Sequence, residues 1–320
     1  MRSFGEKLQA VSLERGRLCV GIDPHPALLE QWGLGVTADG LRRFSRICVE
    51  AFGPSVALVK PQVAFYEAFG SQGYAVLEET IRDLREQGAL VVADAKRGDI
   101  GSTMAAYAEA WLGDSSPLCA DAVTVSPYLG FEALRPALDL AHTHGRGVFV
   151  LAATSNPEGR QVQDCVNTDG VRLDQLMVDA AAAENSSWRK AGEFGDVGVV
   201  VGATLDSVPD LTDLNGPVLM PGVGAQGASA ADVDTLAKKM SAWVFPNISR
   251  GILRHGPGVF ELSQAVSAAA ADYPGFPRRA VRKYRADRGN PEGRDMAFWS
   301  SHLGFSGKSA RLAEALGRHR

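Results

Sequence analysis

The sequence predicts an α/β fold, a (β/α)8 barrel of the TIM type, and three observations lead to this prediction. Short apolar runs typical of strands recur eight times in the first 250 residues. Most neighbouring runs are separated by a segment with helical spacing. The chain has 320 residues, which is long enough for one barrel of roughly 250 residues.

The predicted strands are rich in Val, Ile and Ala, as expected for parallel strands covered on both faces. In chain order they are LCVGID (18–23), ALVKP (57–61), ALVVADA (89–95), DAVTVSP (121–127), GVFVLAATS (147–155), DVGVVVGAT (196–204), PVLMPGVG (217–224) and AWVFPNIS (242–249). An open, doubly wound sheet is the alternative. No G-x-G-x-x-G follows the first run, where a dinucleotide-binding sheet would use one, so we favour the barrel.

The segments between the strands carry helical patterns. Two clear examples are 74–88 (YAVLEETIRDLREQG) and 171–192 (VRLDQLMVDAAAAENSSWRKAG), and each ends near a glycine, as helices often do. We expect one helix in each.

The chain divides into a barrel domain, 1–275, and a C-terminal extension, 276–320. From Pro277 onward eleven Lys and Arg face four Asp and Glu, and no strand pattern is present. We predict a flexible or partly helical appendage. The alternative is an arm that binds polyanions and stacks bases on Trp299 and Phe305.

Composition excludes several classes of function. The formal net charge is −4, which argues against a nucleic-acid or membrane-surface partner for the whole chain. The four cysteines have no C-x-x-C spacing, so we expect reduced, mostly buried thiols rather than disulfides or a zinc site. No apolar segment is long enough to span a membrane, and we expect a soluble cytoplasmic protein.

Charged residues stand at the carboxyl ends of the first three predicted strands. Asp23 ends the first, Lys60 the second, and Asp94 and Lys96 the third. In a parallel barrel these ends meet at one rim, where active sites lie. Strand periodicity places Asp94 and Lys96 on one face above Val92, whereas Asp99 lies beyond a glycine and cannot be placed by strand geometry.

These charges could form only a solvated salt-bridge network. However, four ionisable groups at a partly desolvated rim cost free energy unless a ligand compensates them. We therefore favour a functional site.

Two later stretches stand where such barrels often bind phosphate, after the seventh and eighth strands. In PGVGAQG (221–227), glycines allow backbone amides to approach an anion, and Gln226 adds a side-chain donor. In NISRGI (247–252), Arg250 can offer a planar fork to phosphate oxygens. Each loop alone could be a simple turn, but together they indicate a phosphate site.

The motif set resembles that of the orotidine 5′-phosphate decarboxylase family over about residues 1–272. DAKRGDIGST (94–103) is similar to the form found in its longer bacterial members. The other matching features, in order, are Lys60, SPYLG (126–130), TSNPEG (154–159), PGVGAQG and SRGI.

The resemblance implies conversion of orotidine 5′-phosphate to UMP and CO₂, the last step of de novo UMP synthesis, with no metal or organic cofactor. It makes Lys96 the proton donor to C6 and places Asp94 beside the substrate carboxylate. Lys60 and Asp99 complete an alternating charge array, with Asp99 contributed by the second subunit of a homodimer that shares its active sites.

The resemblance also implies the substrate-binding residues. Asp23 would hold the ribose, Thr103 of the partner chain would assist, Ser126 would read the pyrimidine ring, and Gln226 and Arg250 would hold the phosphate. The chain departs from the family pattern at Ser249, where glycine is usual before the phosphate-binding arginine, and in the basic extension.

Two other functions remain open at this point. Sister barrels, 3-keto-6-phosphogulonate decarboxylase and hexulose phosphate synthase, share Asp-x-Lys-x-x-Asp but bind magnesium through an acidic residue on the second strand. Here that strand carries Lys60, which would repel the metal. A non-catalytic nucleotide-binding barrel is disfavoured by Lys96 and Asp99.

Overall fold

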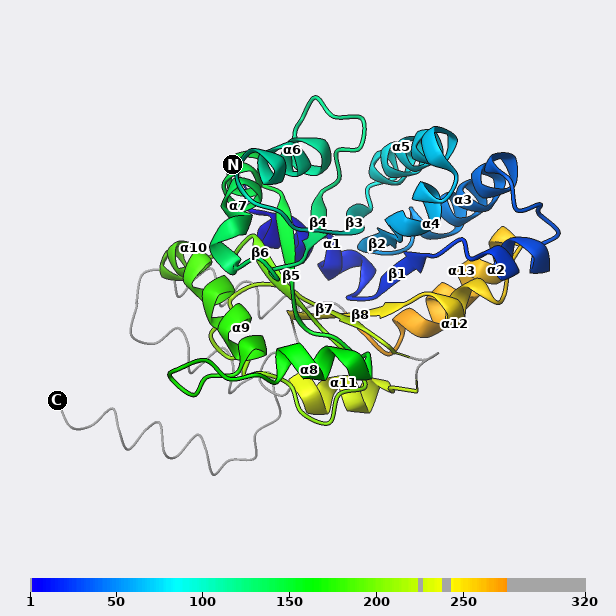
Figure 1. Cartoon of the computed structure of the whole chain (residues 1–320). Coiled ribbons are helices and arrows are strands. Elements are labelled where there is room, and N and C mark those ends of the chain that lie inside the picture. The colour runs from blue at the N-terminus through cyan, green and yellow to red at the C-terminus, as the bar shows by residue number, and fades with distance from the viewer. Residues whose placement is uncertain (1, 224–226, 238–242, 275–320) are drawn as a thin grey trace.

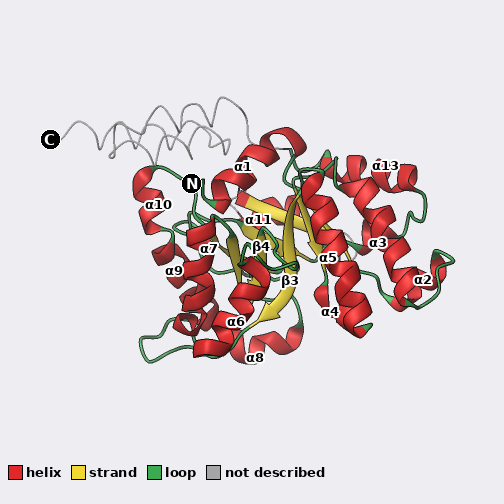
Figure 2. Cartoon of the chain, turned by 90° about the horizontal axis from the view of Figure 1, so that it is seen from above, coloured by secondary structure: helices red, strands yellow, loops and turns green. Residues whose placement is uncertain are grey.

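Eight parallel strands form a closed barrel in the order β1 to β8, surrounded by helices (Figures 1 and 2). The computed structural model describes residues 2–223, 227–237 and 243–274, so the predicted extension lies outside the described residues. The strands are β1 (Cys19–Ile22), β2 (Leu58–Pro61), β3 (Leu90–Arg97), β4 (Ala122–Val125), β5 (Gly147–Ala153), β6 (Val197–Val201), β7 (Val218–Pro221) and β8 (Val244–Ile248). The predicted barrel and all eight predicted strands are confirmed.

Helices lie between most successive strands and surround the barrel, but none is present between β6 and β7 in the described part of the chain. They are α1 (Phe4–Arg15), α2 (Pro26–Gln31), α3 (Ala38–Phe52), α4 (Val63–Glu67), α5 (Gly70–Glu86), α6 (Gly101–Leu112), α7 (Arg135–His144), α8 (Arg160–Gln163), α9 (Leu173–Glu184), α10 (Ser186–Ala191), α11 (Ala230–Ala237), α12 (Arg250–Leu253) and α13 (Val259–Ala270). The 3₁₀ turns named within the described residues are η1 (Phe131–Leu134) and η2 (Pro157–Gly159). No helix in the described part of the chain is long and apolar enough to cross a bilayer.

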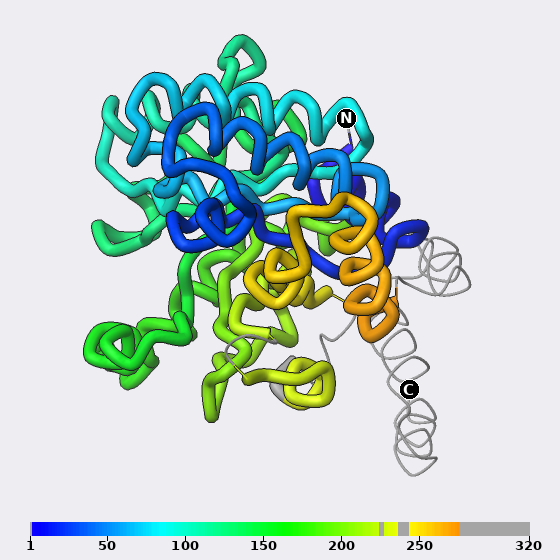
Figure 3. Tube along the Cα trace, turned by 90° about the vertical axis from the view of Figure 1, so that its right-hand side faces the viewer, coloured from blue at the N-terminus to red at the C-terminus, as the bar shows by residue number. Residues whose placement is uncertain are grey.

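The first and last strands of the barrel meet where it closes. Strand β8 pairs in parallel with β1, bringing Asn247 opposite Cys19. Outside this seam α13 lies beside α3, as the orange and blue segments of Figure 3 show, and Ser263 Oγ donates to the Ala51 carbonyl at 3.4 Å. The first and last parts of the barrel therefore stabilise each other.

One predicted helix, 171–192, is two helices. The prediction of a single helix was wrong because Asn185 interrupts it between α9 and α10. The fully buried Asn185 side chain donates through Nδ2 to the carbonyls of Val197 and Leu214, at 2.7 and 2.8 Å. Its Oδ1 accepts from the Val197 backbone amide. These bonds satisfy backbone groups at the start of β6, which a continuous helix would leave to other partners.

Helix α1 closes the amino-terminal end of the barrel. Phe4 and Leu8 are fully buried and belong to the cluster that fills the barrel interior. The Phe4 ring lies edge-on to Phe149, with centroids 6.0 Å apart, and a side chain at Gly147 would collide with it. Full burial of a phenylalanine contributes about 1.5 to 3 kcal/mol, so the packing of α1 stabilises the barrel. The opposite end of the barrel remains open.

Polar contacts fix the start of α1. Ser3 Oγ accepts from the Glu6 amide as the N-cap and donates to the Phe194 carbonyl at 2.5 Å. The buried Asp196 carboxylate accepts from the Phe4 amide, also at 2.5 Å. The start of α1 is thus hydrogen-bonded directly to the residues that lead into β6.

Candidate active site

A cavity of about 330 Å³ opens at the carboxyl end of the barrel. All eight strands or the residues just after them contribute to its wall, in chain order Asp23, Lys60, Asp94, Thr124, Leu151, Val200, Leu219 and Asn247. Leu151, Val200 and Leu219 give it an apolar floor above the packed interior. The cavity therefore combines charged groups with a surface that can receive a flat apolar ring.

Three charged side chains are joined inside this cavity. Asp94 accepts from Lys60 Nζ through Oδ2 at 2.8 Å and from Lys96 Nζ through Oδ1 at 2.5 Å. The side chains of Lys60 and Asp94 are 4% and 9% exposed, whereas that of Lys96 is 44% exposed. One carboxylate thus holds a buried and an accessible ammonium at adjacent positions.

The charges persist despite burial because they are paired. Burial alone would raise the pKa of Asp94, but the Lys60 and Lys96 ammonium groups hold it well below its usual value. Burial likewise disfavours the Lys60 ammonium, yet the Asp94 and Asp23 carboxylates raise the pKa of Lys60 above its usual value. The buried pair Lys60 and Asp94 is therefore ionised at neutral pH.

The third strand departs from regular geometry at the site. Asp94 and Lys96 share one face above buried Val92, as the alternation predicts. However, Lys96 has a φ of +48°, in the left-handed region that few non-glycine residues adopt. The pairing of β3 with β4 also shifts in register between Ala93 and Arg97. The Lys96 side chain is therefore positioned by a locally strained backbone.

The eighth strand supplies the other charged wall. Arg250 is the first residue of α12, is exposed, and lines the cavity together with Ser249 and Gly222. A methyl group on Gly21 would overlap the Ser249 hydroxyl. Glycine at position 21 therefore makes room for the serine that stands before Arg250.

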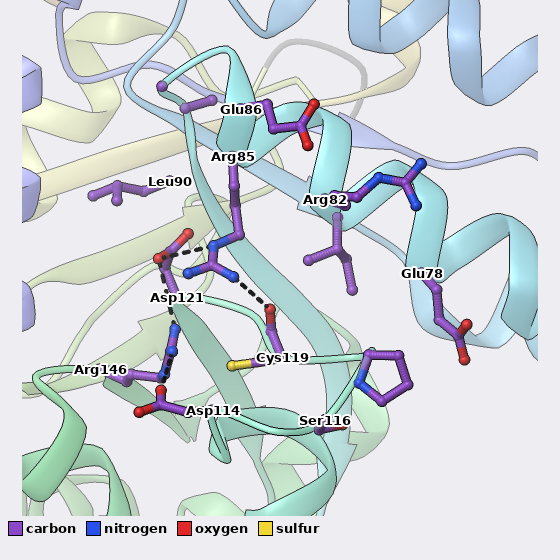
Figure 4. A pocket seen from close by; sticks show the side chains of 14 residues that line it. Glu78, Arg82, Arg85, Glu86, Leu90, Asp114, Ser116, Cys119, Asp121 and Arg146 are labelled. Carbon is purple, nitrogen blue, oxygen red and sulfur yellow. Dashed lines mark hydrogen bonds and ion pairs between the residues drawn. The ribbon is translucent and has the colours of Figure 1, made fainter.

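A larger cavity, about 810 Å³, lies at the opposite end, beside the starts of β3, β4 and β5 (Figure 4). Its arginines already face carboxylates: Arg85 Nε lies 3.5 Å from Asp121 Oδ1, and Arg146 Nη2 lies 2.6 Å from Asp114 Oδ1. Asp121 Oδ2 also accepts from the Val91 amide at 3.0 Å. We interpret these contacts as links that hold α5, the loop after α6 and the starts of β3, β4 and β5 together, on the face that barrels use for stability.

A family model for the orotidine 5′-phosphate decarboxylase / HUMPS family matches residues 16–265. An orotidine 5′-phosphate decarboxylase of Corynebacterium glutamicum is 63% identical over 276 residues, covering 86% of this chain and 99% of the relative. The chain belongs to the orotidine 5′-phosphate decarboxylase family. The family model also includes the sister enzymes. The high sequence identity to an orotidine 5′-phosphate decarboxylase is what distinguishes this chain from them.

Two further comparisons also match orotidine 5′-phosphate decarboxylases. An orotidine 5′-phosphate decarboxylase of Streptomyces coelicolor is 53% identical, covering 85% of this chain and 97% of that one. The structure of Leishmania donovani OMP decarboxylase is 29% identical, has a TM-score of 0.64, and covers 90% of this chain and 99% of its own. The match to decarboxylases therefore extends over almost the whole length of each relative.

The structure brings together five of the residues that the resemblance to orotidine 5′-phosphate decarboxylases singled out. Asp23, Lys60, Asp94, Lys96 and Arg250 all line the central cavity. Three others stand outside its lining, namely Asp99, Thr103 and Ser126. Gln226 lies outside the described residues.

Sequence reasoning missed several polar residues of this decarboxylase cavity. Gln62 Oε1 accepts from Lys60 Nζ at 3.2 Å, and Thr124 Oγ1 donates to Asp94 Oδ1 at 2.9 Å. Thr124 was detectable as the one polar position inside the apolar run AVTV of β4. Asn247 was detectable as an uncharged polar residue preceding the SRGI motif.

Proposed function

We propose that this chain decarboxylates orotidine 5′-phosphate to UMP and CO₂, the final step of de novo UMP synthesis. The observation that carries the proposal is the Lys60–Asp94–Lys96 network at the open end of the barrel, in a chain 63% identical to an orotidine 5′-phosphate decarboxylase. The reaction needs no electron sink beyond the site itself, and we expect neither metal nor organic cofactor.

The chemistry explains why these charges are useful. When the bond between C6 and the carboxylate breaks, an electron pair remains at C6 in the ring plane, where no conjugated carbonyl can accept it. The Lys96 ammonium would stabilise this pair and then transfer its proton to C6, forming UMP. At 4 Å and an effective dielectric near 20, one charge pair is worth about 4 kcal/mol, so a preorganised array can remove much of a barrier.

We assign the remaining charges to orientation. Lys60 binds Asp94 from the buried side, and Lys96 lies on the accessible side. In this arrangement Asp94 would stand beside the substrate carboxylate. Asp23 would bind the ribose hydroxyls. In support, Asp23 Oδ1 is buried and has no hydrogen-bond partner among the described residues, so a ligand donor would satisfy it.

We assign the phosphate to Arg250 and Gln226, and the pyrimidine edge to Ser126. Arg250 begins α12 and lines the cavity. Arginine binds phosphate through two parallel hydrogen bonds, and phosphate binding can lower the barrier at C6 by holding the loops closed.

We further propose a homodimer in which each site is completed by Asp99 and Thr103 of the partner subunit. Ile100, Tyr128 and Leu129 are 63%, 80% and 54% exposed. Large apolar side chains at such exposure favour contact with another protein surface. The four cysteines are free, which fits the reducing cytoplasm as the location of the enzyme.

The sister activities would need a carboxylate where β2 carries Lys60. A decisive experiment adds orotidine 5′-phosphate in the presence of EDTA and follows the loss of the substrate's ultraviolet absorbance. We expect full activity in EDTA and none in a folded Lys96→Ala variant. Activity that disappears with EDTA and returns with magnesium would favour the sister enzymes instead.

A further inference from the structure

We infer that Thr124 is a positioning residue for the decarboxylation, and that its hydroxyl fixes the geometry between Asp94 and Lys96. The inference rests on the proposed function and adds to it a residue on β4. Thr124 is 1% exposed overall and contributes to the cavity wall between the two charged residues.

The hydroxyl makes two hydrogen bonds whose directions are fixed. The Lys96 backbone amide donates to Thr124 Oγ1 at 3.0 Å, and an amide can only donate. The single hydroxyl proton is therefore free for Asp94 Oδ1, which lies 2.9 Å away and can only accept while ionised. Thr124 thus connects the backbone of one charged residue to the side chain of the other.

The first bond helps to hold an unfavourable backbone. Lys96 has a φ of +48°, and a lysine in the left-handed region persists only when its surroundings maintain it. The register shift between β3 and β4 removes Lys96 from the regular ladder, and its amide is bound by Thr124 Oγ1 instead. The β-branched side chain of threonine has few rotamers, so this acceptor is itself well fixed.

The second bond matters when the proton moves. Asp94 Oδ2 is held by Lys60, and Oδ1 receives both Lys96 Nζ and the Thr124 hydroxyl. Lys96 Nζ must give its proton to C6, and it becomes a neutral amine in that step. The Thr124 hydroxyl is neutral throughout and keeps Oδ1 in place while the Lys96 ammonium is lost.

The test compares Thr124→Val, which keeps the shape and removes the hydroxyl, with Thr124→Ser, which keeps the hydroxyl. Thr80→Val is the matched control, because Thr80 is also buried but does not line the cavity. Its hydroxyl donates to the Val76 carbonyl in α5 at 2.7 Å and also bonds the Tyr66 side chain. The measurements are kcat for orotidine 5′-phosphate, the Kd of UMP, and the melting temperature of each variant.

We expect Thr124→Val to lower kcat by about tenfold to a hundredfold, because small misplacement of reacting groups has effects of that size. UMP lacks the carboxylate that reacts, so its Kd should change by less than about twofold. Thr124→Ser should restore kcat to within about threefold of wild type, and Thr80→Val should leave kcat unchanged. If the valine variant does not fold, Thr124→Ala replaces it in the comparison with Thr124→Ser.

Two results would overturn the inference. One is a Thr124→Val enzyme with wild-type kcat. The other is equal loss of kcat and UMP binding in both the valine and serine variants, which would mean that Thr124 only supports the fold. A wild-type enzyme without decarboxylase activity would instead refute the proposed function, so the two failures can be told apart.

Discussion

Lys96 lines the central cavity, whereas the carboxylate of Asp99, three residues later, is turned to the Ile100 backbone amide, 2.8 Å from Asp99 Oδ1. The two residues belong to one motif but face different surroundings within a single chain. Asp99 is half-buried and is followed by the exposed Ile100. This separation supports an active site completed by a second copy of the chain.

Mixed dimers test this arrangement directly. Lys96→Ala and Asp99→Asn chains, each inactive alone, are unfolded and refolded together in equal amounts. Random pairing makes half of the dimers mixed, and one of the two sites in each collects both defects, so recovery should reach roughly one quarter of wild-type activity. If Asp99 serves its own barrel, mass-verified mixed dimers will recover no activity.

Replacement of Arg250 should affect both binding and chemistry. Arg250→Ala should raise KM and lower kcat, together reducing kcat/KM by about a hundredfold or more, because the phosphate contact also stabilises the closed site. Arg254→Ala is the matched control, since Arg254 is exposed, follows the same short helix and does not line the cavity.

The same variant pair can be examined with a substrate that lacks its phosphate. Added phosphite should activate turnover of this substrate by the wild-type and Arg254→Ala enzymes, and much less by Arg250→Ala. The absence of activation at every phosphite concentration would contradict a remote role for the phosphate site.

Removal of residues 281–320 should leave decarboxylation nearly unchanged. Every residue assigned to the site precedes Gly251, and 276 residues of this chain match 99% of a Corynebacterium relative. We expect kcat/KM of the truncated enzyme within about twofold of wild type in the ultraviolet assay. A large decrease in a folded truncated enzyme would mean that the extension acts on the active site.

The contact between Asp196 and α1 should make stability depend on pH. Burial raises the pKa of Asp196 to about 7, although the Phe4 amide and Lys7 oppose the shift. Between the unfolded pKa, about 3.8, and 7, the folded chain holds a proton that the unfolded chain does not, so the free energy of unfolding falls as pH rises.

Asp196→Asn keeps an oxygen for the Phe4 amide and removes this titration. The stability of the variant relative to wild type should therefore increase from pH 5 to pH 8, by about 2 kcal/mol. Urea unfolding at several pH values measures this difference. A constant difference across the range would refute the role of Asp196.

The barrel could be predicted from the sequence because its strands are buried on both faces and read as separate apolar runs. The cavity position followed from the rule that parallel strands end at one rim, which brought Asp23, Lys60 and Asp94 together. The break at Asn185 could not be predicted, because its cause is a set of bonds to Val197 and Leu214, contacts that only the folded chain creates.

The fine geometry of the site was also beyond the sequence. Alternation along β3 predicts neighbouring side chains at positions 94 and 96, but it does not reveal the left-handed backbone of Lys96. The Lys96 amide in that conformation donates to Thr124, which belongs to another strand. Local patterns therefore locate the charges, whereas tertiary contacts determine their orientation.

The closure of the barrel by α1 has a consequence for the order of folding. Ser3 and Phe4 are synthesised well before the residues that they bond, Phe194 and Asp196, which follow 191 and 192 residues later. Joining segments so distant in the chain has a large entropic cost. The contacts of α1 with the residues before β6 offset this cost only once β6 has formed. We therefore expect the emerging chain to expose Phe4 and Leu8 until late in synthesis, with docking of this first helix among the last events that produce the native enzyme.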